Sequence, residues 1–258
     1  MNQTRLLNGR VVGVSISAAE DFTRRHGLEG TAINTITVEL CRRLISLGGR
    51  VALGHKWRPN GVMDAVSRFA SAYHGPSSNP IILNFLAYPD RAALSEQDRE
   101  NLRRLVAIHD DQPKTDDRPA ALRLMREQMA EITHARICLG GPVTPQEDSS
   151  VPGIVEEAVL TLQRGKPVYF SNMLGGVTEV MIATLIDRRV PAWETMGGDH
   201  AKTKQYWEYL ASFGNWNLAK LCGLEEEGEL ERLFNSQNVD TVLQLTCRGL
   251  MKVEVRPF

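Results

Sequence analysis

Two adjacent carboxylates, Glu156 and Glu157, are the side chains of this sequence whose position best suits chemistry. They follow Pro152-Gly153, and a proline there predicts a helix start, because the first helical N–H groups have no partner to lose. A carboxylate beside the anomeric carbon of a sugar could stabilise or attack an oxocarbenium-like centre. Acids in a first helical turn also complement the helix dipole, so a structural role stays open. The helical period places each glutamate about 60° outside the apolar arc and does not choose between them.

Small and cationic residues that could bind an anion follow other apolar runs. GHKWRPNG, residues 54–61, offers two cations, an indole face and a glycine before a predicted helix, whose free N–H groups attract anions. The structural alternative for residues 54–61 is an ordinary solvated turn. The structural alternative for the small residues is that they allow helices to pack closely. The candidate ligand-binding residues are Ser15, Ser17, Gly54, His55, Lys56, Trp57, Arg58, Gly61, Gly140, Gly141, Pro152, Gly153, Glu156, Glu157, Asn172, Gly175 and Gly176.

The elements that must position these residues alternate between short β-branched runs and longer helical patterns. The strand candidates are residues 10–17, 50–54, 80–86, 135–139 and 167–171, and the helix candidates are residues 31–47, 61–72, 96–108, 118–134, 153–164 and 176–187. The strands are uniformly apolar, which is typical of strands covered on both faces by helices. The order predicts an α/β fold: a doubly wound, mainly parallel, Rossmann-like sheet with a C-terminal helical segment.

The loops of this predicted sheet are asymmetric. The turns that enter strands at residues 47–50 and 164–167 are minimal, whereas the exits at residues 17–30, 87–95 and 140–152 are long and polar. Ligands of doubly wound folds bind at the carboxyl ends of the strands, and long loops in an economical domain are commonly functional. The site is therefore expected at the carboxyl edge.

The chain changes character after residue 189. Three of the four tryptophans lie between Trp193 and Trp216, within a segment of large aromatic residues. We predict a sheet domain over residues 1–189 and a C-terminal helical extension over residues 190–258. The extension either packs on the sheet domain or forms a surface between subunits of an oligomer.

Composition excludes several classes of protein. The 258 residues carry a net charge of −1, which argues against a broad basic surface for nucleic acid. No apolar run approaches the ~20 residues of a membrane span, and the first residues lack the apolar segment of a signal peptide. Cys41, Cys138, Cys222 and Cys247 are scattered, as in reduced cytoplasmic proteins. Neither a metal nor a cofactor is expected, and no membrane partner.

Two stretches resemble the SLOG superfamily, which includes the LOG cytokinin-activating enzymes, the DNA-processing protein DprA, and nucleotide-sensing domains of TRPM channels and antiphage effectors. The first, LISLGGRVALGHKWRPNGVMDAVSRFA at residues 44–70, is similar to the family's second strand and the helix after it. The second, at residues 139–176, is similar to its Gly-rich turn, Glu-bearing helix and following strand. The resemblance covers roughly residues 9–187 and implies a Rossmann-like nucleotide-binding fold.

Departures from the LOG pattern direct the functional hypothesis. LOG enzymes carry Pro-Gly-Gly-x-Gly-Thr-x-x-Glu, whereas here ten residues separate Gly141 from Pro152, no Gly-Thr precedes Glu156, and His55 replaces a glycine. The resemblance therefore implies a sensor of an ADP-ribose-like or cyclic nucleotide. The alternative is a nucleotide N-glycosidase or (deoxy)ribosyltransferase that uses Glu157 or Glu156. A homo-oligomer, a separate effector protein and a role in signalling or antiphage defence are further expectations, and a DNA-handling role like that of DprA is disfavoured by the charge.

Overall fold

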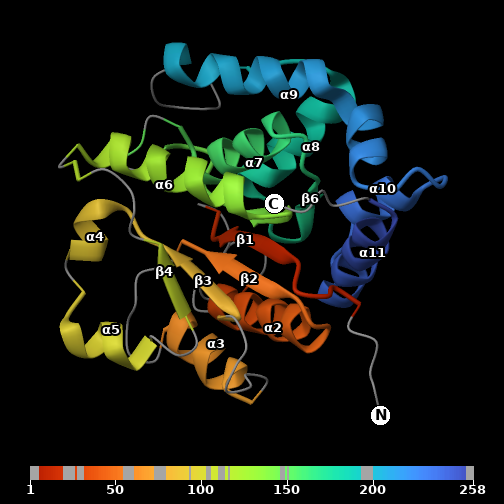
Figure 1. The fold of residues 1–258 in the computed structure, drawn as a ribbon. Coiled ribbons are helices and arrows are strands. Elements are labelled where there is room, and N and C mark those ends of the chain that lie inside the picture. Colours follow the sequence, from red (N-terminus) through yellow and green to blue (C-terminus); the bar gives the residue numbers. More distant parts are fainter. Residues whose placement is uncertain are drawn as a thin grey trace.

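The fold is centred on a six-stranded, all-parallel sheet with the strand order β4-β3-β2-β1-β5-β6 (Figure 1). The computed structural model describes residues 6–19, 27, 32–54, 61–72, 80–92, 94–102, 106–109, 114–115, 117–145, 149, 151–192 and 200–253. The strands are β1 Val11–Ser17, β2 Arg50–Leu53, β3 Ile82–Phe85, β4 Val106–His109, β5 Ala135–Gly140 and β6 Val168–Ser171. The predicted α/β fold with a doubly wound parallel sheet is confirmed.

Helices cover both faces of the sheet, which explains why its strands are mostly apolar. On one face lie α2 (Ala32–Ser46) and α3 (Val62–Ala70), and on the other lie α6 (Arg118–Ile132) and α7 (Gly153–Gln163). Next to α7 is α8 (Gly176–Asp187), and α9 (His200–Leu221) lies outermost over α7 and α8. The strand order reverses between β1 and β5, and such switch points open the ligand crevice of these folds.

One predicted element is wrong. The helix expected over residues 96–108 is instead the short helix α5 (Glu96–Leu102), which follows α4 (Tyr88–Ala92), and the strand β4. The run Val106–His109 pairs with β3 in parallel, from Ile82↔Val106 to Phe85↔His109. Four residues next to a helical pattern are too few to show the periodicity of a strand. The conformation of this segment is therefore determined by its pairing with β3.

The C-terminal helices pack on the sheet. Trp207 of α9 is fully buried in the same hydrophobic cluster as the sheet residues. The hydroxyl of Tyr169 in β6 donates to the carbonyl of Cys222 (3.2 Å), and that of Ser171 donates to the carbonyl of Ser236 (3.0 Å). Helix α10 (Glu229–Phe234) lies against β6, and α11 (Val239–Lys252) lies against α2. The division of the chain into domains at residue 189 stays a prediction.

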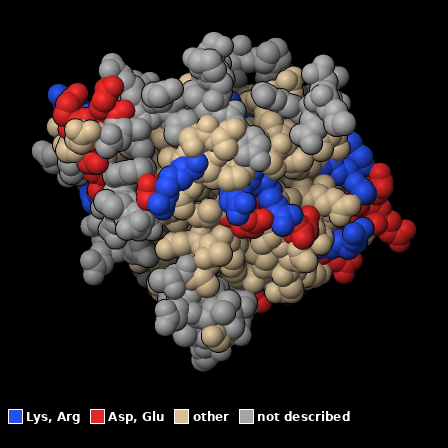
Figure 2. Space-filling model, turned by 90° about the horizontal axis from the view of Figure 1, so that it is seen from below, with Lys and Arg blue, Asp and Glu red and all other residues tan. Residues whose placement is uncertain are grey.

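The underside of the molecule, where α2 and α3 lie, carries charges of both signs (Figure 2). Blue and red side chains lie next to one another there, between uncharged surface. Among the described residues, Arg42 and Arg43 pair with Glu39, and Lys252 pairs with Glu226. This face therefore lacks, over its described part, the single-sign field that a nucleic-acid surface requires.

The imidazole of His134 makes the stability dependent on pH. Its Nδ1 accepts a hydrogen bond from the N–H of Val11 (3.1 Å), and burial, followed by the charges of Lys166, Arg10 and Arg50, lowers its pKa. As pH falls through about 6.5 the unfolded chain takes up a proton that the folded chain does not, so the fold loses stability. We expect His134→Asn, which keeps an acceptor for Val11, to flatten the fall in melting temperature between about pH 7.5 and 5.5. Thermal melts test this, and an equal fall in both proteins would contradict it.

Candidate functional site

The switch point brings together most of the predicted site residues. Ser17 at the end of β1 pairs in register with Gly140 at the end of β5, and the N–H of Gly141 donates to the carbonyl of Ser17 (2.8 Å). The N–H of Val177 in α8 donates to the carbonyl of Gly141 (2.9 Å), so the exits of β5 and β6 touch. The helix α7 begins at Gly153 beside them. The carboxyl edge therefore positions the expected candidates from β1, β5, α7 and α8.

Backbone proximity explains the paired glycines of this edge. A Cβ on Gly176 would lie 2.2 Å from the carbonyl oxygen of Gly141, and one on Gly141 would lie 2.7 Å from Cδ1 of Ile154. Both residues have positive φ angles, 63° and 91°. Glycine is thus needed where two turns cross, and contact between these glycines and a ligand stays a prediction. Asn172, in the 3₁₀ turn Asn172–Leu174 before Gly175, accepts a hydrogen bond from the Gln237 amide (3.1 Å).

The candidates after β2 are only partly placed. Residues 55–58, which include His55, Lys56, Trp57 and Arg58, lie outside the described residues. Gly54 follows β2, with its missing Cβ 3.3 Å from Cε of Met129 in α6. Gly61 precedes α3 and lines an open groove between α2 and α3. Ligand contact from this exit stays a prediction.

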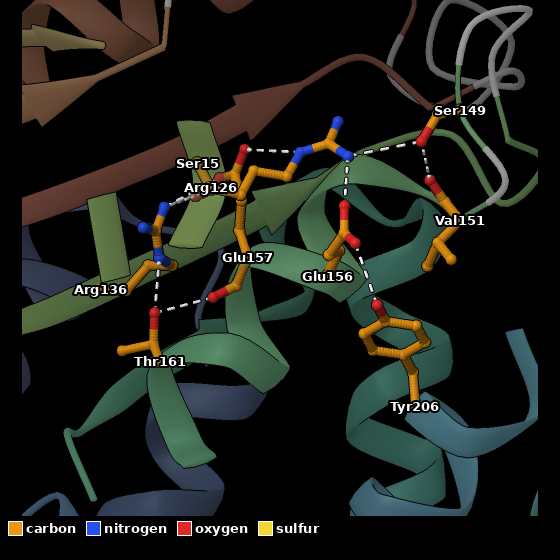
Figure 3. Close-up of polar contacts among 9 residues, drawn as sticks. All are labelled: Ser15, Arg126, Arg136, Ser149, Val151, Glu156, Glu157, Thr161 and Tyr206. Carbon is orange, nitrogen blue, oxygen red and sulfur yellow. Dashed lines mark hydrogen bonds and ion pairs between the residues drawn. The ribbon is translucent and has the colours of Figure 1, made fainter. Parts of the chain in front are cut away.

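Glu156 is buried in an ion pair rather than free at the crevice (Figure 3). Its Oε2 accepts from Nη1 of Arg126 in α6 (2.5 Å), and its Oε1 accepts from the hydroxyl of Tyr206 in α9 (3.0 Å). Burial, and then the negative charge of Glu156, raises the pKa of Tyr206 to about 12. The phenol is therefore a hydrogen-bond donor at neutral pH, and both oxygens of Glu156 are engaged.

Glu157 faces different partners from those of Glu156, and only one of its two carboxylate oxygens accepts hydrogen bonds from the described residues. Its Oε2 accepts from Nη1 of Arg136 in β5 (2.8 Å) and from the hydroxyl of Ser15 in β1. Its Oε1 lies 3.8 Å from Nε of Arg126, an ion-pair distance without a hydrogen bond. The side chain is 15% exposed, against 6% for Glu156. Glu157 is therefore the carboxylate with an oxygen available to a ligand.

Arg136 completes a network that sequence reasoning missed. It is fully buried, its Nη1 also donates to Oγ of Ser15 (2.7 Å), and its Nε donates to Oγ1 of Thr161 in α7 (3.0 Å). A Cβ on Gly13 would lie 3.2 Å from its Cζ, so the glycine of β1 leaves room for the guanidinium. The signal available in the sequence was an arginine inside the apolar run ARICLG, because a buried charge requires a partner.

The network is balanced in charge: two arginines, Arg126 and Arg136, face Glu156 and Glu157. Buried charges are tolerated when they are paired and hydrogen-bonded. Two buried donors, Nε of Arg126 and Nη2 of Arg136, nevertheless have no hydrogen-bond partner among the described residues. The network therefore retains donor capacity that its own carboxylates do not use.

The N-terminus of α7 lies against a cation. Pro152 is its N-cap residue and makes no side-chain cap, and its carbonyl accepts from the N–H groups of Val155 (3.0 Å) and Glu156 (3.2 Å). Within the described residues, the N–H groups of Gly153 and Ile154 have no partner. A Cβ on Gly153 would lie 2.7 Å from Nη2 of Arg126, so the guanidinium lies against the first turn. Ser149 Oγ lies 3.4 Å from Nη1 of the same arginine. Free N–H groups, the helix dipole and a guanidinium together favour a bound anion.

Other chemistries find less support in the described part of the chain. The four cysteines are buried and unpaired by disulfides, and burial raises the pKa of the Cys138 thiol to about 12. Within the described residues, no three His, Cys, Asp or Glu side chains cluster as metal ligands would. In that same part of the chain, no helix has the length and apolar character needed to cross a membrane.

Comparisons with known proteins identify the family. The crystal structure of TM1055, a structural genomics target, is similar at a TM-score of 0.42 and 18% identity, over 73% of this chain and 89% of that one. No curated protein matches the chain significantly. The family model described as SLOG cluster2 matches residues 6–239, which confirms the resemblance seen in the sequence and extends it into the C-terminal helices. The chain therefore belongs to the SLOG cluster2 family.

Proposed function

We propose that this protein binds a small nucleotide-derived ligand, of ADP-ribose-like or cyclic-nucleotide type, in the crevice at the carboxyl ends of β1 and β5. Membership of the SLOG family supports a nucleotide-related binding or glycosidase-type domain. The observation that carries the proposal is Arg126, whose guanidinium lies against the uncapped N-terminus of α7. A phosphate at that position would meet backbone N–H groups and a partly used guanidinium.

A phosphate bound at the N-terminus of α7 would also determine where the ribose and the base of the ligand lie. Oε1 of Glu157, which accepts no hydrogen bond from the described residues, could accept one from a ribose hydroxyl. The base would then extend toward the exits of β1 and β2, and its predicted partner is Trp57, which lies outside the described residues, or an apolar wall. The homo-oligomer, the separate effector, the signalling or antiphage role and the cytoplasmic location remain predictions beside this proposal.

The alternative function, N-glycosidase or (deoxy)ribosyltransferase, depends on Glu157 alone. Both oxygens of Glu156 accept hydrogen bonds from groups that would have to move before a lone pair could approach C1′. Glu157 has one oxygen held by Ser15 and Arg136 and the other directed away from them, an arrangement that would suit a carboxylate beside an oxocarbenium-like centre. Turnover distinguishes the two functions.

A ligand panel tests the proposal. We expect one of AMP, ADP-ribose, NAD or a cyclic dinucleotide to raise the melting temperature and to be recovered intact, since a ligand at about 100 times its Kd adds about 2.7 kcal/mol of stability. Arg126→Gln should abolish that shift, and Gly153→Ala should weaken it without altering any charge, because the new Cβ displaces the guanidinium. The readouts are thermal melts and mass spectrometry of the recovered ligand.

The control is Arg68→Gln, which removes the same charge from an arginine 65% exposed on α3. It should leave the shift unchanged. A panel without any shift would overturn the proposed ligand class. Release of a free base that Glu157→Gln abolishes would replace binding by the alternative enzyme.

A further inference from the structure

One side chain of α9, the first of the C-terminal helices, joins the network of arginines and glutamates beside the proposed anion site. Tyr206 is 5% exposed, and its hydroxyl donates to Oε1 of Glu156 at 3.0 Å (Figure 3). The same hydroxyl oxygen accepts from Nη1 of Arg123 in α6, at 3.3 Å. The phenol is therefore fixed from both sides and connects α9 with α6 and α7.

The hydroxyl determines how Arg126 uses its donors. Oε1 of Glu156 accepts from the hydroxyl of Tyr206, and its Oε2 accepts from Nη1 of Arg126. Only one nitrogen of the guanidinium therefore donates to that carboxylate. The Nε of Arg126 makes no hydrogen bond to any residue that the structure describes, and its Nη2 lies against Gly153. Without the phenol, Oε1 would be a buried acceptor without a donor, and a carboxylate with two free oxygens pairs with guanidinium in a bidentate fork. Such a fork would turn the donors of Arg126 away from the helix N-terminus.

We infer that Tyr206 is a positioning residue of the anion site: by occupying one oxygen of Glu156, it keeps the guanidinium of Arg126 directed at the N-terminus of α7. The inference rests on the proposed function, whose ligand binds at that N-terminus. It also means that the C-terminal helices are part of the site, because α9 sets the donor geometry without touching the ligand.

Tyr209 on the same helix is a matched control. It is half-buried, its ring lies 5.8 Å from that of Phe213, and its hydroxyl has no hydrogen bond within the described part of the chain. Tyr209→Phe thus removes the same atom from the same helix without altering the contact to Glu156.

Binding of inorganic pyrophosphate, measured by titration calorimetry, tests the inference. We expect Tyr206→Phe to weaken binding about 10- to 100-fold, as for loss of a hydrogen bond to a charged group, and Tyr209→Phe to change it by less than about twofold. If Tyr206 acts through Glu156, Tyr206→Phe should have no further effect in a Glu156→Leu background, which lacks both acceptor oxygens. A loss from general loosening of α9 would instead add to that of Glu156→Leu and appear in Tyr209→Phe.

A second measurement does not require any ligand. The ¹⁵N NMR signal of the Arg126 Nε–H should shift in Tyr206→Phe and remain in place in Tyr209→Phe. If the wild-type protein binds no pyrophosphate, the proposed anion site at α7 fails as a site for free pyrophosphate, the nucleotide panel still decides the proposed function, and this signal still decides whether Tyr206 positions Arg126. An unmoved signal in Tyr206→Phe overturns the inference, as does an unchanged affinity where pyrophosphate binds.

Discussion

Arg136→Met is expected to lower the free energy of unfolding by about 3–5 kcal/mol, because it leaves a carboxylate without its main partner. The guanidinium is fully buried and donates to Glu157, Ser15 and Thr161. In its absence, Glu157 would keep the Ser15 hydroxyl and an Arg126 Nε at 3.8 Å. Methionine fills much of the volume, so the loss reports charge and hydrogen bonding rather than a cavity. Urea unfolding measures it.

Two further variants separate electrostatics from packing. Arg136→Met combined with Glu157→Gln buries no unpaired charge and should recover much of the loss, because replacing both partners of a buried pair costs far less than removing one. Arg164→Met removes an arginine that pairs with the exposed Glu131, and it should cost less than about 1 kcal/mol. A double variant as unstable as Arg136→Met would show that shape, not charge, makes Arg136 necessary.

The sheet was predictable because its signals are local. Uniformly apolar runs such as Val11–Ser17 identify strands covered on both faces, and the helix Gly176–Asp187 has the bounds that its pattern predicts. The edge strand Val106–His109 was missed because four residues are too few for a strand periodicity to be recognised. Its conformation depends on pairing with β3, a contact 24 residues away at Ile82↔Val106.

The location of the candidate site could be predicted from the sequence, but the contacts between its side chains could not. The switch point follows from the order of the elements, and it does gather Ser15, the glycine turns and both glutamates. The helical period could not separate Glu156 from Glu157, since their difference lies in partners on other elements. Tyr206 is 50 residues from Glu156, and no local pattern links a phenol on one helix to a carboxylate on another.

Gly176→Ala is expected to destabilise the protein by about 3–5 kcal/mol, beyond what its backbone angle explains. With φ of 63°, an alanine there pays about 1–2 kcal/mol for a left-handed conformation. Its Cβ would also lie 2.2 Å from the carbonyl oxygen of Gly141 and 2.7 Å from Cβ of Ala19. Neither atom can rotate away, so the β5 exit and the start of α8 must separate, which breaks the hydrogen bond from Val177 to Gly141.

Gly165→Ala isolates the steric part of that effect. Gly165 has nearly the same φ, 67°, but nothing lies within 4 Å of the position of a Cβ. It should therefore lose only the about 1–2 kcal/mol of the left-handed conformation. Urea unfolding of both variants gives the difference, which measures how tightly the two turns of the carboxyl edge are held together. Equal losses would mean that the turns separate freely, and the proposed phosphate site at α7 would then lack a rigid floor.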